Sequence, residues 1–209
     1  MEYRYVIVLC EGQSEESFIK RVLSPYLIYH GIYVNPVILG GVSRYAGIRR
    51  ELKRLGKNSS GSLTTMLDYY KLPQDFPGVA TCNETEPCKI AAYIEDEVYK
   101  DLKNEISSIT FFPYIQMHEY ESLLFSDVSQ FTNCQGMSKT MVNMLEKQVM
   151  EFESPEHVNN SEQTAPSKRI LSIYPAYQKV SDGTMIAENI GLEKIMGKCL
   201  HFAEWVRKF

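Results

Sequence analysis

Carboxylate side chains follow three apolar runs of this sequence, each at the point where the run ends. These side chains are Glu11, after residues 6–10, Asp68, after residues 63–67, and Glu119 and Glu121, after a run that ends at residue 117. Carboxylates that are brought together repel one another, so protonation, a basic side chain or a metal ion must neutralise them. Hard oxygen ligands suit Mg²⁺ or Mn²⁺, and an ion held in this way typically promotes chemistry at phosphate. An interpretation of equal weight is that Glu11 is a solvated turn residue or helps to cap the next helix.

Hydrophobic periodicity predicts the elements that must position these carboxylates. Short apolar runs predict strands over residues 5–10, 34–39, 63–67 and 110–117. Helices are predicted from Ser14, as N-cap, to Gly31, with a kink at Pro25, and over residues 45–56 and 89–106. This alternation favours a mostly parallel sheet with helices on both faces, a Rossmann-like α/β fold. Ligands bind at the carboxyl ends of the strands of such sheets, so the four carboxylates are expected to converge there.

The character of the sequence changes near residue 130. Helices are predicted over residues 135–153 and 186–208, and residues 154–167 between them are polar and irregular. We therefore expect an α/β domain over residues 1–130 and a helical C-terminal subdomain over residues 131–209 that packs on it. Residues 118–121 stay ambiguous: a continued strand would place Glu119 and Glu121 on one face, whereas a new helix would align His118 with Glu121.

Composition narrows the class of protein. The 209 residues are 44% hydrophobic and 23% charged, which is ordinary for a soluble globular protein. No apolar run is long enough to span a bilayer and no signal peptide is recognisable, so we expect a cytoplasmic protein without membrane contact. The five cysteines are scattered without a CxxC pair, which argues for free thiols and against structural zinc.

The net charge of −4 means that any contact with nucleic acid requires a local basic patch or bound cations. One candidate patch is the polar side of the predicted helix over residues 45–56, where Arg50 and Arg54 are positioned to follow a phosphate backbone. The more ordinary interpretation is a solvated helix face.

The order of the N-terminal elements resembles the Toprim domain, which occurs in topoisomerases, bacterial primases and the OLD (overcoming-lysogenization-defect) family of nucleases. Its motifs are a Glu after the first strand, which Glu11 matches, and an Asp-x-Asp after the third strand. Asp68 matches the first Asp of that motif, but Tyr70 stands at the second. Glu119 or Glu121 is then expected to supply the missing ligand.

Five strings of the sequence are similar to those of an uncharacterised prokaryotic family with a Toprim-like domain, known as a domain of unknown function. They are CEGQSEESFIKRVLSPYL, TTMLDYYKLPQDFPG, PYIQMHEYESLLFSD, APSKRI and CLHFAEW. Members of that family often lie beside ATPase genes in defence-like settings. The resemblance therefore implies an ATPase partner, and assembly into a homo-oligomer is also compatible with it.

The resemblance to OLD-type nucleases implies roles for two basic residues after the polar loop. Lys168 would offset charge in the transition state, and Arg169 would hold a phosphate with its planar guanidinium. The alternative is a solvated helix start.

We accordingly expect a Mg²⁺- or Mn²⁺-dependent nuclease of DNA or RNA, working with an ATPase in anti-phage defence. Glu11 and Asp68 would be catalytic with Lys168, and Glu11, Asp68, Glu119 and Glu121 would hold the metal. The alternative is a non-catalytic partner subunit of an ATPase complex, which the Tyr70 substitution favours.

Overall fold

A parallel sheet forms the centre of the computed structural model, which describes residues 4–41, 44–58, 61–159 and 161–209. Its strands are β1 (Arg4–Cys10), β2 (Ile32–Ile38), β3 (Ser62–Asp68), β4 (Thr110–Phe112) and β5 (Ile115–Gln116). The order is β2-β1-β3-β4, and β5 pairs with the end of β3. All of these pairs are parallel, so the predicted α/β class is confirmed.

The predicted strand over residues 110–117 is two short strands, which corrects that prediction. Pro113 separates β4 from β5, and proline has no amide hydrogen with which to continue a ladder. Both pieces still pair with β3, β4 at residues 62–64 and β5 at Leu67 and Asp68.

The first helical segment is irregular, as Pro25 predicts. It consists of α1 (Gln13–Phe18), a π-helical turn (Ile19–Leu23) and α2 (Ser24–Ile28). Its N-cap is Gly12 and not Ser14, because the Glu15 carboxylate reaches back and accepts the Gly12 amide hydrogen at 2.9 Å. Gly31, with φ of +73°, follows the segment and turns the chain into β2.

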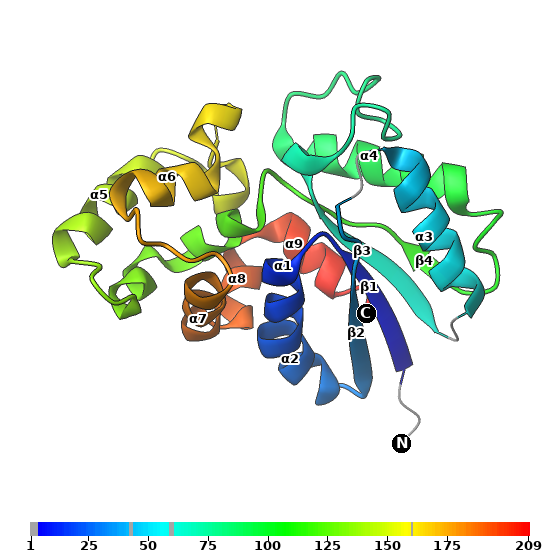
Figure 1. The fold of residues 1–209 in the computed structure, drawn as a ribbon, viewed down its shortest axis with the longest axis horizontal. Coiled ribbons are helices and arrows are strands. Elements are labelled where there is room, and N and C mark those ends of the chain that lie inside the picture. The colour runs from blue at the N-terminus through cyan, green and yellow to red at the C-terminus, as the bar shows by residue number, and fades with distance from the viewer. Residues whose placement is uncertain (1–3, 42–43, 59–60, 160) are drawn as a thin grey trace.

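Helices cover both faces of the sheet, as Figure 1 shows. One face packs against α3 (Tyr45–Asn58) and α4 (Pro87–Leu102) through a core that includes Leu9 and Leu63. The other face, with Val8 and Met66, packs against the first helical segment and the last helices of the chain. The central strands β1 and β3 are therefore largely buried on both sides, which explains their continuous apolar runs, whereas the edge strand β2 alternates buried and exposed residues over its first half.

The C-terminal third is helical but more divided than predicted. A 3₁₀-helical stretch (Tyr120–Asn133) leads into α5 (Lys139–Val149), α6 (Pro166–Ile173), α7 (Ser181–Ile190), α8 (Leu192–Lys198) and α9 (Leu200–Val206). Short 3₁₀ helices cover Tyr69–Lys71, Pro155–His157 and Glu162–Thr164.

Two of the predicted C-terminal helices need correction. The helix over residues 135–153 is shortened to α5, because Gly136 has φ of +92° and Ser138 caps the start of the helix by accepting the Met141 amide hydrogen. The helix over residues 186–208 is interrupted at Gly191, with φ of +81°, and again at Cys199.

The core continues across the predicted boundary at residue 130. Trp205, on α9, stacks on Tyr114 with ring centroids 4.4 Å apart, and its indole nitrogen donates a hydrogen bond to Thr64 Oγ1 at 2.8 Å. The C-terminal helices are thus part of the support of the sheet. Among the described residues, the longest helices fall short of what is needed to cross a bilayer.

Candidate functional site

A cleft of about 410 Å³ lies where β1, β2 and β3 end. Glu11 and Gly12 line it after β1, Gly40 after β2, and Asp68 and Lys71 after β3. This is the position that the parallel sheet predicts for a ligand site.

Glu11 and Asp68 face the same cleft from adjacent strands. In the β1–β3 register Cys10 lies opposite Met66, so the next residues along bring Glu11 beside the end of β3. A hydrogen bond from the Asp68 backbone reaches the Glu11 carboxylate and acts to lower its pKa. Asp68 Oδ1 accepts the Tyr120 amide hydrogen at 3.0 Å, which holds this buried carboxylate in place.

Burial and the charges of neighbouring carboxylates disfavour the charged forms of these two acids. Burial, followed by the charge of Glu15, raises the pKa of Glu11 to about 7, although Lys71 and Lys179 oppose the shift. Burial, followed by the charges of Glu15, Glu11 and Glu121, raises the pKa of Asp68 well above its ordinary value. Both acids therefore tend to stay protonated at a pH at which an exposed carboxyl would be ionised.

Glu15 is a further carboxylate of this cluster, and it was not among the predicted metal ligands. It is 6% exposed, and its carboxylate accepts the Gly12 amide hydrogen. Its position four residues after Glu11 was the signal that could have identified it, since α1 turns it back toward the end of β1.

Lys179 is the second residue that the sequence did not identify. Its Nζ lies 2.9 Å from Oε1 and 3.1 Å from Oε2 of Glu121, which is fully buried. The charges of Glu121, Glu119 and Asp68 raise the pKa of Lys179 against the opposing effect of its burial. Lys179 lies in the turn before α7, and no motif marks it.

The ambiguity over residues 118–121 is resolved in favour of a turn. His118 has φ of +62°, which ends the strand direction, and the 3₁₀ helix starts at Tyr120. The two acids then point to different partners. Glu121 pairs with Lys179, whereas Glu119 Oε2 accepts the Ser167 amide hydrogen at 2.9 Å at the start of α6.

Tyr70, at the position of the missing second Asp, belongs to the 3₁₀ turn after β3. Its ring lies 5.4 Å from that of His118, centroid to centroid, and its amide donates to the His118 carbonyl at 3.3 Å. The same turn directs the next residue, Lys71, to the cleft.

The predicted phosphate-binding residues lie outside the lining of the cleft. Lys168 is exposed one residue after the Ser167 contact with Glu119. The Arg169 guanidinium donates to the carbonyls of Thr164, at 2.8 Å, and Gln148, at 3.3 Å. It also lies 5.2 Å from the centre of the Phe152 ring. Arg169 therefore links three segments of the C-terminal region, and its role toward phosphate stays a prediction.

The basic arc of α3 is exposed, but its charges are partly neutralised. Arg54 pairs with Glu51, Nε to Oε2 at 2.9 Å, and Arg49 pairs with Asp101 at 2.9 Å. Arg50 is exposed on the same arc. A phosphate backbone would have to compete with these acids along most of the helix.

The donor set of the cleft fits a hard divalent cation. Mg²⁺ is commonly held by one or two carboxylates, with water and substrate phosphate completing its shell, and Glu11 and Asp68 supply such a pair. The two acids that repel each other would both be stabilised by a bound cation. In the part of the chain that the structure describes, a tighter group of three potential ligands lies elsewhere, at Glu86, Cys88 and His157.

Comparison with known proteins gives a family but no activity. Residues 10–209 match the model of a family described as a domain of unknown function, DUF4276. Neither the curated proteins nor the solved structures gave a match.

Proposed function

We propose, from the premise that this chain belongs to the DUF4276 family, that it is a Mg²⁺- or Mn²⁺-dependent nuclease of Toprim type that cleaves phosphodiester bonds in DNA or RNA. One observation carries the proposal: Glu11 and Asp68 meet in a cleft at the carboxyl ends of β1 and β3, with pKa values raised by burial and then by neighbouring carboxylates, Glu15 first among them. A cleft that contains carboxyls with strongly raised pKa values is a candidate functional site.

Glu11 and Asp68 would hold the ion, and the charges of Glu15 and Glu121 would strengthen the negative potential that attracts it. When bound, Mg²⁺ supplies polarisation of a phosphoryl oxygen and a water of lowered pKa. Lys71, in the cleft, would draw the phosphate to the site by charge. Lys168 follows Ser167, whose amide hydrogen Glu119 accepts, and it would approach the substrate from the C-terminal side.

The resemblance to OLD-type nucleases extends the proposal to an ATPase partner in anti-phage defence. That part rests on the similarity of the sequence strings alone. A non-catalytic partner subunit is the second candidate, and two observations favour it. Tyr70 replaces a Toprim acid and contacts His118, and Lys179 already neutralises Glu121.

Cleavage of labelled single- and double-stranded DNA and of RNA, with Mg²⁺, with Mn²⁺ and with EDTA, tests the proposal. We expect cleavage only with divalent metal, and its loss in Glu11→Gln and in Asp68→Asn. Glu16→Gln is a matched control, because Glu16 is a nearby acid on α1 that pairs with Lys20 at 2.7 Å and does not line the cleft.

A result in favour of the second candidate is equally well defined. It would be a folded protein that binds no Mg²⁺ or Mn²⁺ by calorimetry and cleaves none of the substrates, alone or with an added ATPase partner. Equal cleavage by Glu11→Gln and Glu16→Gln would also reject the proposed site.

A further inference from the structure

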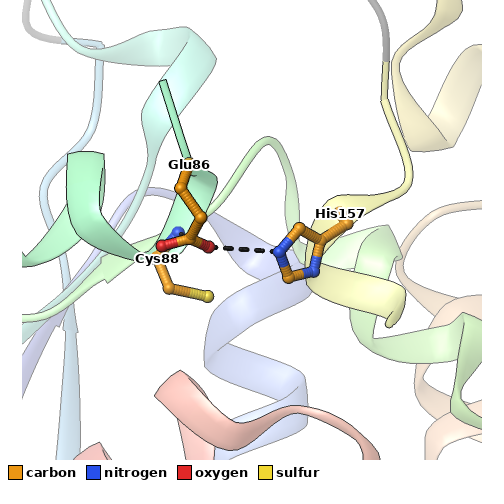
Figure 2. A group of neighbouring side chains, drawn as sticks. All are labelled: Glu86, Cys88 and His157. Carbon is orange, nitrogen blue, oxygen red and sulfur yellow. Dashed lines mark hydrogen bonds and ion pairs between the residues drawn. The ribbon is translucent and has the colours of Figure 1, made fainter. Parts of the chain in front are cut away.

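Three potential metal ligands of different chemistry meet away from the cleft, between the start of α4 and the 3₁₀ turn Pro155–His157. One carboxylate oxygen of Glu86, the sulfur of Cys88 and one ring nitrogen of His157 all lie within 4.8 Å of one another. Figure 2 shows the three side chains facing one another across the contact between these two segments. Each is half-buried, so the group is accessible to an ion from solvent but shielded by the protein.

We propose that Glu86, Cys88 and His157 form a binding site for a Zn²⁺-class transition-metal ion, with one oxygen, one sulfur and one imidazole nitrogen as its ligands. Zn²⁺ accepts all three of these ligand types, whereas Mg²⁺ and Ca²⁺ take oxygen alone. Three protein ligands leave a fourth position for water or another group. This inference is independent of the proposed nuclease function.

The surroundings of His157 favour a ligand role. Its Nδ1 lies 2.7 Å from Ser154 Oγ, and its Nε2 lies 3.1 Å from Glu86 Oε1. Because an ionised carboxylate only accepts, Nε2 donates its hydrogen to Glu86 as the side chains lie. A bound metal ion would take the place of that hydrogen, the ring proton would move to Nδ1, and the Ser154 hydroxyl would accept the hydrogen bond from Nδ1. Hydrogen bonding of the second nitrogen is the usual support of a metal-bound histidine.

Glu86 is held in place by the helix that it caps. Its two carboxylate oxygens accept the amide hydrogens of Cys88 and Lys89, each at 2.9 Å. Burial acts to raise the pKa of Glu86, but these hydrogen bonds outweigh that effect and its pKa is lowered. The carboxylate is therefore charged at neutral pH and available to a cation.

Cys88 is a thiol that a metal would convert to a thiolate. Burial, and then the charges of Glu156 and Glu86, raise its pKa. Its Sγ lies 3.9 Å from Oε2 of the buried Glu156. Coordination would break the S–H bond, form the metal–sulfur bond and release the proton to the buffer. A bound ion would also connect α4 with the C-terminal region, because Glu86 and His157 are 71 residues apart in the sequence.

The test titrates the full-length reduced protein with Zn²⁺ by calorimetry and with Co²⁺ by absorption spectroscopy, in the presence of excess Mg²⁺. We expect one tight Zn²⁺ site, release of a proton, a higher melting temperature and a thiolate-to-cobalt charge-transfer band in the near ultraviolet. Cys88→Ser should remove the band, and His157→Gln should weaken Zn²⁺ binding by more than about tenfold. Ser154→Ala, which changes only the support of His157, should weaken binding by about tenfold.

Two controls separate this site from others. Cys82→Ser removes the neighbouring half-buried thiol, and Glu11→Gln changes the cleft, so both should retain the band and the affinity. Circular dichroism identifies any variant that fails to fold. If His157→Gln does not fold, the Zn²⁺ affinity of Ser154→Ala tests the role of His157 instead. Absence of tight Zn²⁺ binding, a band that survives Cys88→Ser, or loss of binding in Glu11→Gln would overturn the proposal.

Discussion

Glu11 is the residue at which the charge of the cleft is most readily measured. Its pKa is raised from 4.5 to about 7, so folding favours the protonated carboxyl. A group whose pKa is raised on folding stabilises the protein below its unfolded pKa, and that contribution is lost as the pH rises through its folded pKa. The metal-free protein should therefore lose stability between about pH 4.5 and pH 7 through this residue.

Glu11→Gln removes the charge and should relieve this loss. Without metal, the variant should be more stable than the original protein by about 1–2 kcal/mol at about pH 8, and nearly unchanged at about pH 4.5. Thermal unfolding in EDTA at both pH values measures the difference. The same gain at both pH values, or an equal gain in Glu16→Gln, would contradict the role of the cleft.

Lys179 and Glu121 form the one ion pair at the site that involves a fully buried carboxylate among the described residues. Lys179→Met should destabilise the protein by about 1–3 kcal/mol, because it leaves the buried Glu121 carboxylate without a counter-charge. The effect is at the lower end for a buried pair because the Lys179 side chain is partly exposed to solvent. Adding Glu121→Gln should recover part of this loss. A double-mutant cycle by urea unfolding measures the coupling, and additive losses would show that the two residues do not interact.

Lys168 is the predicted cation for the transition state, and Lys71 is the lysine that lines the cleft. Lys168→Ala should slow cleavage by about 3 kcal/mol of transition-state stabilisation, by analogy with the loss of one oxyanion donor. Single-turnover cleavage under saturating Mg²⁺ measures the effect. An unchanged rate would contradict the predicted role of Lys168 and leave Lys71 as the cation that lines the cleft.

At the scale of elements, the buried carboxylate of Glu156 caps the start of the last helix, α9. Glu156 is 1% exposed, and its two oxygens accept the amide hydrogens of His201, at 3.1 Å, and Phe202, at 2.9 Å. These are free donors at the start of α9, and satisfying them lets the chain begin a new helix after Cys199.

Glu156→Gln should therefore destabilise the protein by about 1–3 kcal/mol, because an amide group offers one acceptor where two are needed. Glu204→Gln, on the exposed side of α9, is the matched control and should change stability by less than about 0.5 kcal/mol. Chemical unfolding of both variants measures the difference, and equal stability would show that Glu156 does not act as a cap.

At the scale of the whole molecule, the sheet and the C-terminal helices share one core. The cluster that holds Val8 and Met66 of the sheet also holds Phe202 and Trp205 of α9. Arg21 and Glu188 add a two-pronged ion pair, at 2.8 and 2.9 Å, between the N-terminal helical segment and α7.

We expect the two regions to unfold in one cooperative transition. Trp205 is the single tryptophan, so its fluorescence reports the C-terminal core, and far-ultraviolet circular dichroism reports all helices. The two signals should coincide across a urea titration. Separate midpoints would show that residues 131–209 are an independent subdomain.

The sequence by itself determined the α/β class and the edge of the sheet at which the cleft with Glu11 and Asp68 lies. Both follow from local rules: apolar runs that end in turns predict strands, and parallel strands present their carboxyl ends at one edge. Glu11 and Asp68 were identifiable because each follows its own strand directly. The break between β4 and β5 was also predictable from the sequence, because it depends on the single residue Pro113, although the apolar run predicts one continuous strand there.

Tertiary structure decided which other residues join these acids. Lys179 reaches Glu121 over 58 residues of chain, and His157 reaches Glu86 over 71. No local pattern marks such pairs, because their distance depends on how the C-terminal helices pack on the sheet. The absence of a CxxC pair argued against zinc, yet the fold assembles a mixed group of ligands from separate elements. Long-range packing, which a linear motif does not contain, is the physical reason for the difference.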